Sequence, residues 1–483
     1  MSGLKNKTIK GLFWSFLDSI AGQGFNFLIG IILARILSPR EFGLIGMLTL
    51  FIILSETIVQ SGFTTALIRK SDCTDDDYST VFIFNVFISF LLYGILFIGA
   101  NSIATFYNES QLEILLKVLG ISVIINAFSL VQKSILTKNI NFKLQTNISI
   151  IASFTSGVIS IWMAVNGYGV WSLVSWALTR FLFTTIFLWF FVKWKPSLVF
   201  SKSSFTELFS FGSKLLISGL LNTTSTNIYH LIIGKYFSVI HLGYYTRAKQ
   251  FTDLPSNNLN SIIGRVTFPV LSTIQHDKVV FKDKYKKIVT SSMFISFILM
   301  FGLAAVAEPL VITLIGEKWR PIIIYLQLLC FAGSLYPLHS LNLSILKIYG
   351  RSDLFLRLEI IKIFLIIPFV YFGIKYGLTY LIVGQLMTSI IAFFLNSYWS
   401  KKIINYSSWS QLMSIAPSFL LAIIISSIIF VTGNSLNISP LLTLFIQITG
   451  GMILIVLMCE ISNIEDYQYI KASIVGYLRY NEK

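Results

Sequence analysis

The chain has 483 residues, of which 55% are hydrophobic and only 12% are charged, and its formal net charge is +16. Soluble domains carry about 25% charged residues, so this composition excludes a soluble globular protein and indicates a chain that crosses a membrane many times. A basic soluble protein would suggest nucleic acid as its partner. Here the charge fits the Lys and Arg of cytoplasmic loops, and we expect no nucleic-acid partner.

Apolar stretches of about 20 residues, long enough to cross a membrane, follow one another along nearly the whole chain. They predict an all-α polytopic membrane protein with about fourteen spans. The spans are 11–37, 41–63, 78–101, 112–132, 146–166, 169–192, 208–233, 242–272, 285–307, 321–346, 354–374, 376–399, 411–432 and 438–459. The connections are too short to hold a soluble domain.

The cationic residues are distributed unevenly over the two predicted sides of the membrane. With the N-terminus in the cytoplasm, the inner segments hold most of the Lys and Arg. The outer loops hold few: Arg35, Arg40, Lys235, Lys318, Arg320 and Lys375. This is the positive-inside distribution, so we expect the bacterial cytoplasmic membrane, with both termini in the cytoplasm.

Several segments occur twice at nearly one offset. "ARILSPREFG" (34–43) is echoed by "GKYFSVIHLG" (234–243), with a basic residue, a Ser and a Gly at matching places. "KSILTKNINF" (133–142) is echoed by "LSILKIYGRS" (343–352), and "YGVWSLVSWALT" (168–179) by "YGLTYLIVGQLMT" (376–388). The order predicts two parallel six-span repeats. We divide the chain into a first lobe (1–195), a second lobe (196–405), two extra helices (406–460) and a cytoplasmic tail (461–483).

Two like-oriented bundles are typical of an alternating-access transporter. The chain has no P-loop, no dinucleotide fingerprint and no Ser-His-Asp spacing, so we expect no enzyme. The acidic run "DCTDDD" (72–77) is interpreted as a solvated loop or helix cap. Three cysteines lack the spacing of a disulfide framework or zinc site, and we expect no metal and no cofactor.

Ionisable residues inside spans are costly, so each is a functional hypothesis. The eighth span is the richest, with Arg247, Lys249, Asp253 and Arg265. Lys249 and Asp253 are i,i+4 neighbours and are expected to neutralise each other. The two arginines are separated by about 27 Å of helix, so they lie near opposite mouths. They either line a water-filled cavity or extend to the membrane interfaces.

Other spans carry further polar candidates. Glu56 in the second span is either the partner of an arginine across the seam between the two bundles or a proton-coupling carboxylate. The spans that open the two repeats carry Asp18 and Arg35 in the first, and Asn222 and Asn227 in the second. Arg35 and its counterpart Lys235 either flank the outer mouth of a cavity or anchor their helices. Weaker candidates are Arg180, His230, Gln385 and the i,i+3 pair Glu359–Lys362.

The polar positions of these spans are net positive, which suits an anionic substrate, and arginine suits phosphate because its planar fork binds two oxygens. The blocks "LARILSPREFGLIGM", "GYGVWSLV", "LGYYTRAKQFTDLPSNNL", "RVTFPVLSTIQHD" and "YPLHSLNLSILKIYGRSDLFLRLEIIK" closely resemble bacterial polysaccharide exporters of the MATE-like MOP superfamily, of the colanic-acid and teichuronic-acid type. The resemblance extends to about residue 410.

That resemblance implies twelve to fourteen helices in two lobes and a flippase for an undecaprenyl-pyrophosphate-linked oligosaccharide. It places the family's basic positions at Arg35, Arg69, Arg247 and Arg265, and an acidic one at Glu56. We therefore expect Arg247, Arg265, Arg35, Lys249, Asn222 and Asn227 to bind substrate, and Glu56, Asp253 and Asp18 to serve in coupling or ion pairing. Expected partners are the lipid-linked oligosaccharide, membrane lipids, and a polysaccharide polymerase with its chain-length machinery.

Three alternatives remain. A cation-coupled exporter of the same superfamily is disfavoured, because a cavity for cationic solutes should be acidic. A membrane polymerase or ligase needs a large outer loop with acid–base residues, and the outer connections here are short. A flippase for a peptidoglycan precursor is a near variant of the first hypothesis.

Overall fold

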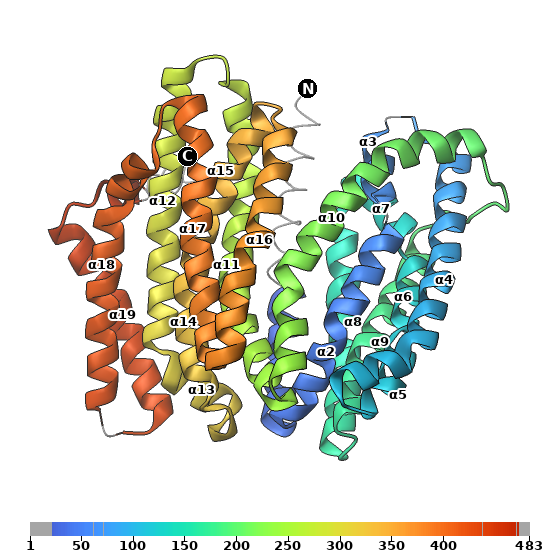
Figure 1. Cartoon of the computed structure of the whole chain (residues 1–483), viewed down its shortest axis with the longest axis horizontal. Coiled ribbons are helices and arrows are strands. Elements are labelled where there is room, and N and C mark those ends of the chain that lie inside the picture. The colour runs from blue at the N-terminus through green and yellow to red at the C-terminus, as the bar shows by residue number, and fades with distance from the viewer. Residues whose placement is uncertain (1–21, 61, 71, 437, 470, 473–483) are drawn as a thin grey trace, which may run out of the picture. The chain divides into compact units, whose positions relative to one another are not determined.

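The computed structural model describes residues 22–60, 62–70, 72–436, 438–469 and 471–472, and all regular elements in these ranges are helical (Figure 1). The described part divides into two compact units, which meet in sequence at Thr246 and Arg247 inside one long helix. The predicted boundary at 195/196 concerns the sequence repeat rather than compactness, and it stays a prediction. The all-helical class is confirmed.

The first unit begins with an apolar helix, Gly22–Ile36. It continues with α2 (Pro39–Gln60), α3 (Phe63–Arg69), α4 (Asp75–Tyr107), α5 (Gln111–Leu119), α6 (Ile121–Ala127), α7 (Leu130–Lys138), α8 (Phe142–Val165), α9 (Val170–Phe191), α10 (Lys202–Tyr236) and the start of α11 (Val239–Thr273).

The second unit contains the rest of α11 and eight further α-helices. These are α12 (Lys278–Ala305), α13 (Ala307–Ile315), α14 (Ile322–Ser334), α15 (Tyr336–Ile348), α16 (Ser352–Tyr376), α17 (Leu378–Ile404), α18 (Ser408–Ser435) and α19 (Pro440–Ile461). A short 3-10 turn, Glu317–Trp319, follows α13.

Ten helical segments of the described residues are long and apolar enough to span a membrane. The three long helices α10, α11 and α16 are not among them, and the first predicted span falls partly on residues 1–21, which lie outside the described residues. The count of fourteen is therefore not confirmed. The physical reason for α11 is plain: its ionisable residues and amides lower its hydropathy although its 35 residues exceed the membrane thickness.

Three of the ten spans contain more than one helix, and two of these three are divided near their middle. The segment Gln111–Lys138 is divided into α5, α6 and α7, and the segment Ile322–Ile348 is divided at Leu335 into α14 and α15. Pro337 stands in the first turn of α15, where its missing N–H costs no hydrogen bond. The two broken spans occupy equivalent places in the predicted repeats. Interrupted spans at matching places are typical of transporter binding sites.

The repeated helix ends pack against each other within the first unit. A Cβ built on Gly43 of α2 would lie 1.9 Å from the carbonyl oxygen of Val239, and one on Gly243 of α11 would lie 1.9 Å from that of Pro39. The glycines thus permit a reciprocal backbone crossing of α2 and α11. The close neighbour of each glycine belongs to the other copy of the motif.

A network of charges ties α10 to the rest of the first unit. Lys70 Nζ lies 3.0 Å from Asp77 and 3.0 Å from Glu207 of α10, and Lys138 Nζ donates to the Lys70 carbonyl at 2.7 Å. The hydrogen bond to Glu207 raises the pKa of Lys70 above its ordinary value. Thr74 and Asp77 form a capping box at the start of α4, so the interpretation of 72–77 as a helix cap is confirmed.

The C-terminal segment after α19 packs back onto the second unit. Asp466 is buried and accepts hydrogen bonds from Thr290 Oγ1 of α12 at 2.6 Å and from Ser418 Oγ of α18 at 3.4 Å. Lys287 lies over the ring of Tyr469 at 4.5 Å. The described part of the predicted tail is therefore a docked element of this unit.

Candidate functional site

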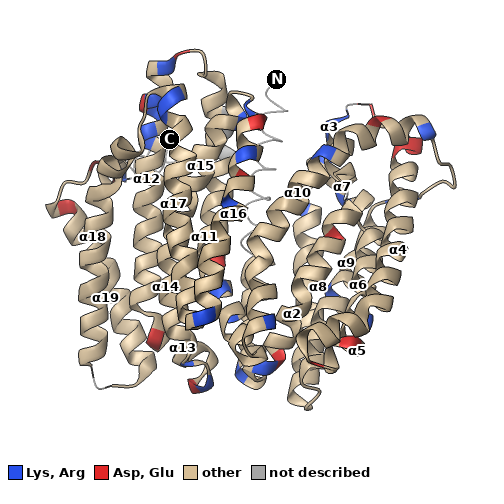
Figure 2. Ribbon diagram, in the orientation of Figure 1, with Lys and Arg blue, Asp and Glu red and all other residues tan. Residues whose placement is uncertain are grey.

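Two polar clusters lie within the helices, one in each compact unit. Figure 2 shows that α18 and α19 carry almost no charge along their length, whereas Lys, Arg, Asp and Glu occur along α11 and α16. Because charged side chains inside a membrane-spanning bundle are costly, such positions are functional candidates.

The first cluster surrounds Glu56 of α2. Arg180 of α9 and Lys133 of α7 both interact electrostatically with its carboxylate, and all three side chains are half-buried. In the next position of α2, Thr57 Oγ1 lies 3.3 Å from Thr223 Oγ1 of α10. Two cations face one carboxylate, so the cluster has a formal charge of +1. The arginine near Glu56 is thus in the same unit, and the proton-coupling hypothesis for Glu56 stays open.

The second cluster combines two ion pairs from α11 and α16. Lys249 Nζ lies 3.3 Å from Asp253 Oδ2, and Lys362 Nζ lies 2.6 Å from Glu359 Oε1, as the i,i+4 and i,i+3 spacings predicted. Tyr336 of α15 interacts electrostatically with Lys249, Asp253 and Glu359, which belong to both pairs. Tyr336 directly follows the break at Leu335, in the middle of its span.

His339 lies one turn after Tyr336 and is held on both sides of its ring. The Asn396 amide Nδ2 lies 3.3 Å from Nδ1, and Ser389 Oγ lies 2.9 Å from Nε2. Since an amide nitrogen only donates, Nδ1 accepts and Nε2 carries the proton that is donated to Ser389. Lys362 of α16 also acts electrostatically on His339 of α15, which is hydrogen-bonded to α17. His339 therefore connects the three helices.

The structure describes the side chain of only one of the two arginines that the sequence analysis singled out in α11. Arg247 is buried, with only 3% of its surface exposed, and its Nη1 donates to Gln250 Oε1. It therefore does not line an open cavity in this conformation. The side chain of Arg265 and all of Asp18 lie outside the described residues, so their expected roles remain predictions.

The basic residues of the repeated helix ends differ as well. Arg35 is exposed at the end of Gly22–Ile36. Lys235 Nζ donates to the Phe106 carbonyl at 2.5 Å and lies 4.5 Å from the centre of the Phe106 ring. This contact binds Lys235 to the C-terminal turn of α4, where the helix dipole favours a cation. Lys235 therefore acts as an anchor, whereas both interpretations of Arg35 stay open.

The two predicted amides of α10 differ in their surroundings. Asn227 Nδ2 donates to the Thr223 carbonyl at 2.9 Å, and Asn222 is exposed. His230 is buried and meets the Tyr245 ring edge-on at 5.6 Å, as expected for a packed histidine. Arg69, a basic position implied by the family resemblance, stacks over the Phe211 ring at 4.4 Å.

Sequence reasoning missed Tyr336 and His339. The available signal was the pair Tyr336–Pro337 inside an apolar span, since Pro indicates a helix break and a break indicates a possible site. No sequence signal marks Lys133, because its position near Glu56 depends on how α7 packs beside α2.

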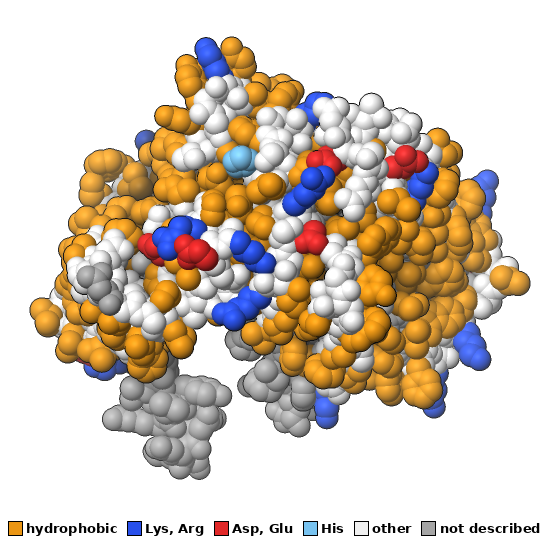
Figure 3. Space-filling view, turned by 90° about the horizontal axis from the view of Figure 1, so that it is seen from below, with side chains coloured by type: hydrophobic (Ala, Val, Ile, Leu, Met, Phe, Trp, Pro, Cys, Tyr) orange, Lys and Arg blue, Asp and Glu red, His pale blue; other side chains and the backbone are white. Residues whose placement is uncertain are grey.

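Charged residues at helix ends also form ion pairs, as in Arg40–Glu109 at 2.8 Å and Arg320–Glu308 at 2.5 Å. Figure 3 shows a face on which basic and acidic side chains lie next to each other and hydrophobic side chains surround them. Among the described residues, no group of three His, Cys, Asp or Glu side chains could hold a metal ion.

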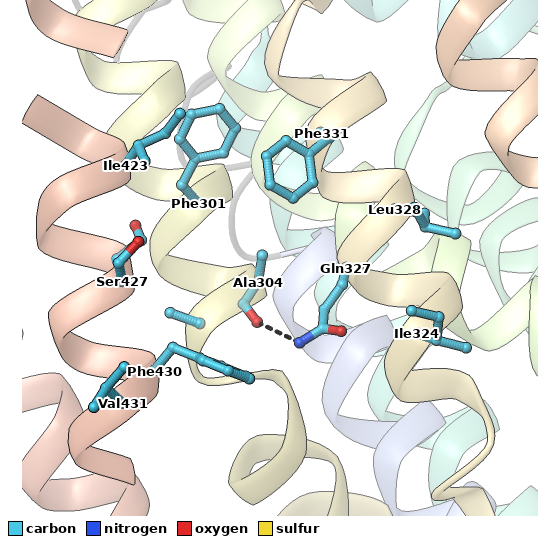
Figure 4. A pocket seen from close by; sticks show the side chains of 12 residues that line it. Phe301, Ala304, Ile324, Gln327, Leu328, Phe331, Ile423, Ser427, Phe430 and Val431 are labelled. Atoms are coloured by element: carbon cyan, nitrogen blue, oxygen red, sulfur yellow. Dashed lines mark hydrogen bonds between the residues drawn. The ribbon is translucent and has the colours of Figure 1, made fainter. Parts of the chain in front are cut away.

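A separate apolar cavity of about 470 Å³ lies in the second unit among α12, α14 and α18 (Figure 4). Phe301, Phe331 and Phe430 line it. Its polar members are Gln327, which donates to the Ala304 carbonyl at 3.3 Å, and the two serines Ser426 and Ser427. The residues of the two polar clusters do not line it. Its lining therefore suits an apolar chain and not a charged group.

Comparisons with known proteins identify the family and the fold of the chain. The model of the family "Polysaccharide biosynthesis protein" matches residues 32–324. The chain is 28% identical to an "Uncharacterized membrane protein in cps region" of Klebsiella pneumoniae over 77% of each chain. It is 27% identical to the "Lipopolysaccharide biosynthesis protein WzxC" of Escherichia coli (strain K12) over 81% of each chain.

A solved structure shares the fold. The "Lipid II flippase MurJ, inward closed conformation" aligns with a TM-score of 0.73 and 16% identity, covering 94% of this chain and 99% of that chain. The expectation of a multi-pass membrane protein with the MOP fold is thereby confirmed. The chain belongs to the polysaccharide biosynthesis protein family, and it shares its fold with a lipid II flippase and with a transporter of the MOP superfamily.

Proposed function

We propose that this protein moves an undecaprenyl-pyrophosphate-linked oligosaccharide from the inner to the outer leaflet of the cytoplasmic membrane, by alternating access. Family membership supports a role in making a surface polysaccharide, and the fold of a lipid II flippase supports movement of a lipid-linked saccharide. The single observation that carries the chemistry is the +1 cluster of Arg180, Lys133 and Glu56 among membrane-spanning helices.

That cluster supplies what a pyrophosphate needs in a bilayer. Arginine offers planar paired donors and lysine adds a second positive charge, while Glu56 neutralises only one of the two cations. Desolvation strengthens this attraction, since few water molecules screen it. Glu56, with Asp253 and Asp18, is the proposed coupling group, because binding of an anion beside it changes its electrostatic surroundings.

The other predicted substrate contacts remain part of the proposal. Arg35, Arg265, Lys249, Asn222 and Asn227 are candidates for contacts along the path of the saccharide. Arg247 is buried, so a movement of α11 has to precede any contact between it and the substrate. The proposed orientation has both termini in the cytoplasm, and the proposed partners are a polysaccharide polymerase and its chain-length machinery.

Deleting the gene in its native host tests this function. We expect loss of the surface polysaccharide and accumulation of lipid-linked repeat units in the inner leaflet. Complementation with Arg180→Gln should restore little export, whereas the control Arg320→Gln, in an exposed outer ion pair, should restore it fully. Normal export in a deletion strain without a paralogue would refute the proposal.

A second candidate of the same class is the export of a peptidoglycan precursor. The TM-score of 0.73 with a lipid II flippase favours its consideration. Loss of each candidate function predicts a different phenotype. Loss of peptidoglycan-precursor export stops growth, whereas loss of surface-polysaccharide export changes the cell surface. A viable deletion strain with an intact cell wall therefore rejects the second candidate.

A further inference from the structure

The cluster around Glu56 in the first unit and the cluster of ion pairs in the second unit differ in net charge. In the second unit, two lysines are matched by two carboxylates, so the set Lys249, Asp253, Lys362 and Glu359 is formally neutral. Arg247, the nearest further cation along α11, is buried. A pyrophosphate gains little from a neutral set, because each carboxylate repels it as each ammonium attracts it.

A neutral set of ion pairs suits a hydroxyl group instead. A sugar hydroxyl both donates and accepts hydrogen bonds, a carboxylate only accepts, and an ammonium only donates. Each ion pair can therefore satisfy one hydroxyl completely. The side chains are accessible for this purpose, since Lys249 is 22% exposed, Asp253 42%, Lys362 18% and Glu359 19%.

Tyr336 adds an aromatic ring that acts electrostatically with members of both pairs. It is 45% exposed and interacts electrostatically with Lys249, Asp253 and Glu359. An aromatic ring with a polar tip covers the C–H face of a flat, amphipathic ligand while its hydroxyl reaches a polar group. Its place directly after the break in the Ile322–Ile348 span puts the ring at the middle of that span.

The surroundings hold this arrangement in place. His339, one turn beyond Tyr336, is fixed by Ser389 and Asn396 of α17. Asn342, a further turn on, forms a reciprocal amide pair with Gln411 of α18 at 3.0 and 3.1 Å. The helix that carries Tyr336 is therefore fixed by buried hydrogen bonds on the side of α17 and α18, which favours a preformed binding surface.

We propose that Tyr336 and the ion pairs Lys249–Asp253 and Lys362–Glu359 form a subsite for the uncharged hydroxyls of a saccharide. This inference rests on the proposed function, and it assigns recognition of the sugar to these residues of the second unit. The sugar sits against the Tyr336 ring, its hydroxyls donate to Asp253 and Glu359, and they accept from Lys249 and Lys362.

Binding of two lipids to the full-length protein in nanodiscs tests the subsite. The probes are undecaprenyl pyrophosphate without sugar and the lipid-linked repeat unit extracted from the native host. Wild-type protein should bind the sugar-bearing lipid at least tenfold more tightly. Glu359→Gln and Tyr336→Leu should each remove about tenfold of that preference, because one charged partner or one stacking surface is lost, and affinity for the sugar-free lipid should stay within twofold.

Matched controls separate the subsite from general damage. Asp353→Asn breaks an exposed ion pair on the same helix α16, and Tyr371→Leu removes an exposed ring from it; neither should change the preference. Exchanging the charges in the double variant Lys249→Asp, Asp253→Lys keeps the pair and should retain more preference than Lys249→Asp alone. A thermal-unfolding check confirms that each variant is folded.

The outcomes distinguish the subsite from the function on which it rests. If the variants weaken both lipids equally, or neither, the subsite is wrong. If wild-type protein binds both lipids with equal affinity, the subsite is also wrong although pyrophosphate recognition stands. If wild-type protein binds neither lipid, the proposed function itself fails.

Discussion

The crossing of the repeated helix ends makes the sharpest stability prediction. In the first unit, Gly43 and Gly243 each face a backbone carbonyl of the opposite motif, and a Cβ on either would lie 1.9 Å from its oxygen. Real Cβ atoms essentially never come within 3.0 Å of such an atom, so Gly43→Ala has to separate the two backbones by about 1 Å.

The expected cost follows from that displacement. Overpacking of this kind costs about 1–3 kcal/mol, and a gap of this size forfeits a quarter to a half of each dispersion contact along the crossing. Gly94→Ala is the matched control, since a Cβ there meets nothing within 4 Å and α4 is helical throughout. That substitution should leave stability unchanged or raise it slightly.

Unfolding in mixed micelles by titration with a denaturing detergent measures both variants. Because one movement of the backbones relieves both clashes, the double variant Gly43→Ala, Gly243→Ala should cost clearly less than the sum of the two single variants. If Gly43→Ala is as harmless as Gly94→Ala, or if the two costs simply add, the reciprocal crossing is refuted.

Three further predictions concern buried or bridging polar groups. The pKa of Lys70 is raised in the folded state, so its ion pairs add stability below the unfolded pKa of about 10.4 and lose it as pH rises through the higher folded value. The difference in unfolding free energy between wild type and Lys70→Met should therefore be constant to about pH 10 and shrink above it. A difference that stays constant above pH 10 contradicts this. Asp466→Ala should release the C-terminal segment and speed its cleavage by trypsin severalfold, whereas the exposed neighbour variant Glu465→Ala should not; equal cleavage rates contradict docking through Asp466. Asn342→Leu leaves the buried Gln411 amide without its partner and should cost about 1–3 kcal/mol in the same detergent titration, and a neutral effect would mean that the pair adds no stability.

Much of the fold was predictable because membrane spans have a strong signal. Length and hydropathy identified the long helices, and ten of them meet the criteria for a span. The helices α10, α11 and α16 do not meet those criteria, because polar residues lower the hydropathy of a helix whether they face other helices or water. The break at Leu335 was not predicted, because Pro337 at a helix start and in a helix interior look alike in an apolar run.

The candidate site was predictable only within single helices. The pairs Lys249–Asp253 and Glu359–Lys362 follow from i,i+4 and i,i+3 spacing, which is local geometry. Their interaction with Tyr336 is not local, because it depends on how α11, α15 and α16 pack.

The cluster around Glu56 also depends on how helices pack, so it could not be predicted from the sequence. The helices α2, α7 and α9 bring Lys133 and Arg180 to its carboxylate across 77 and 124 residues of chain, a separation at which sequence spacing carries no information about contact.

Translocation by the purified protein tests the central claim most directly. Wild-type protein is reconstituted into proteoliposomes that contain a fluorescent undecaprenyl-pyrophosphate-linked oligosaccharide, and a membrane-impermeant quencher reports how much lipid reaches the outer leaflet. We predict that quenching extends beyond the half that faces outward at the start, and that Arg180→Gln largely abolishes this gain. Quenching that stops at the same half in vesicles with and without wild-type protein would contradict the account.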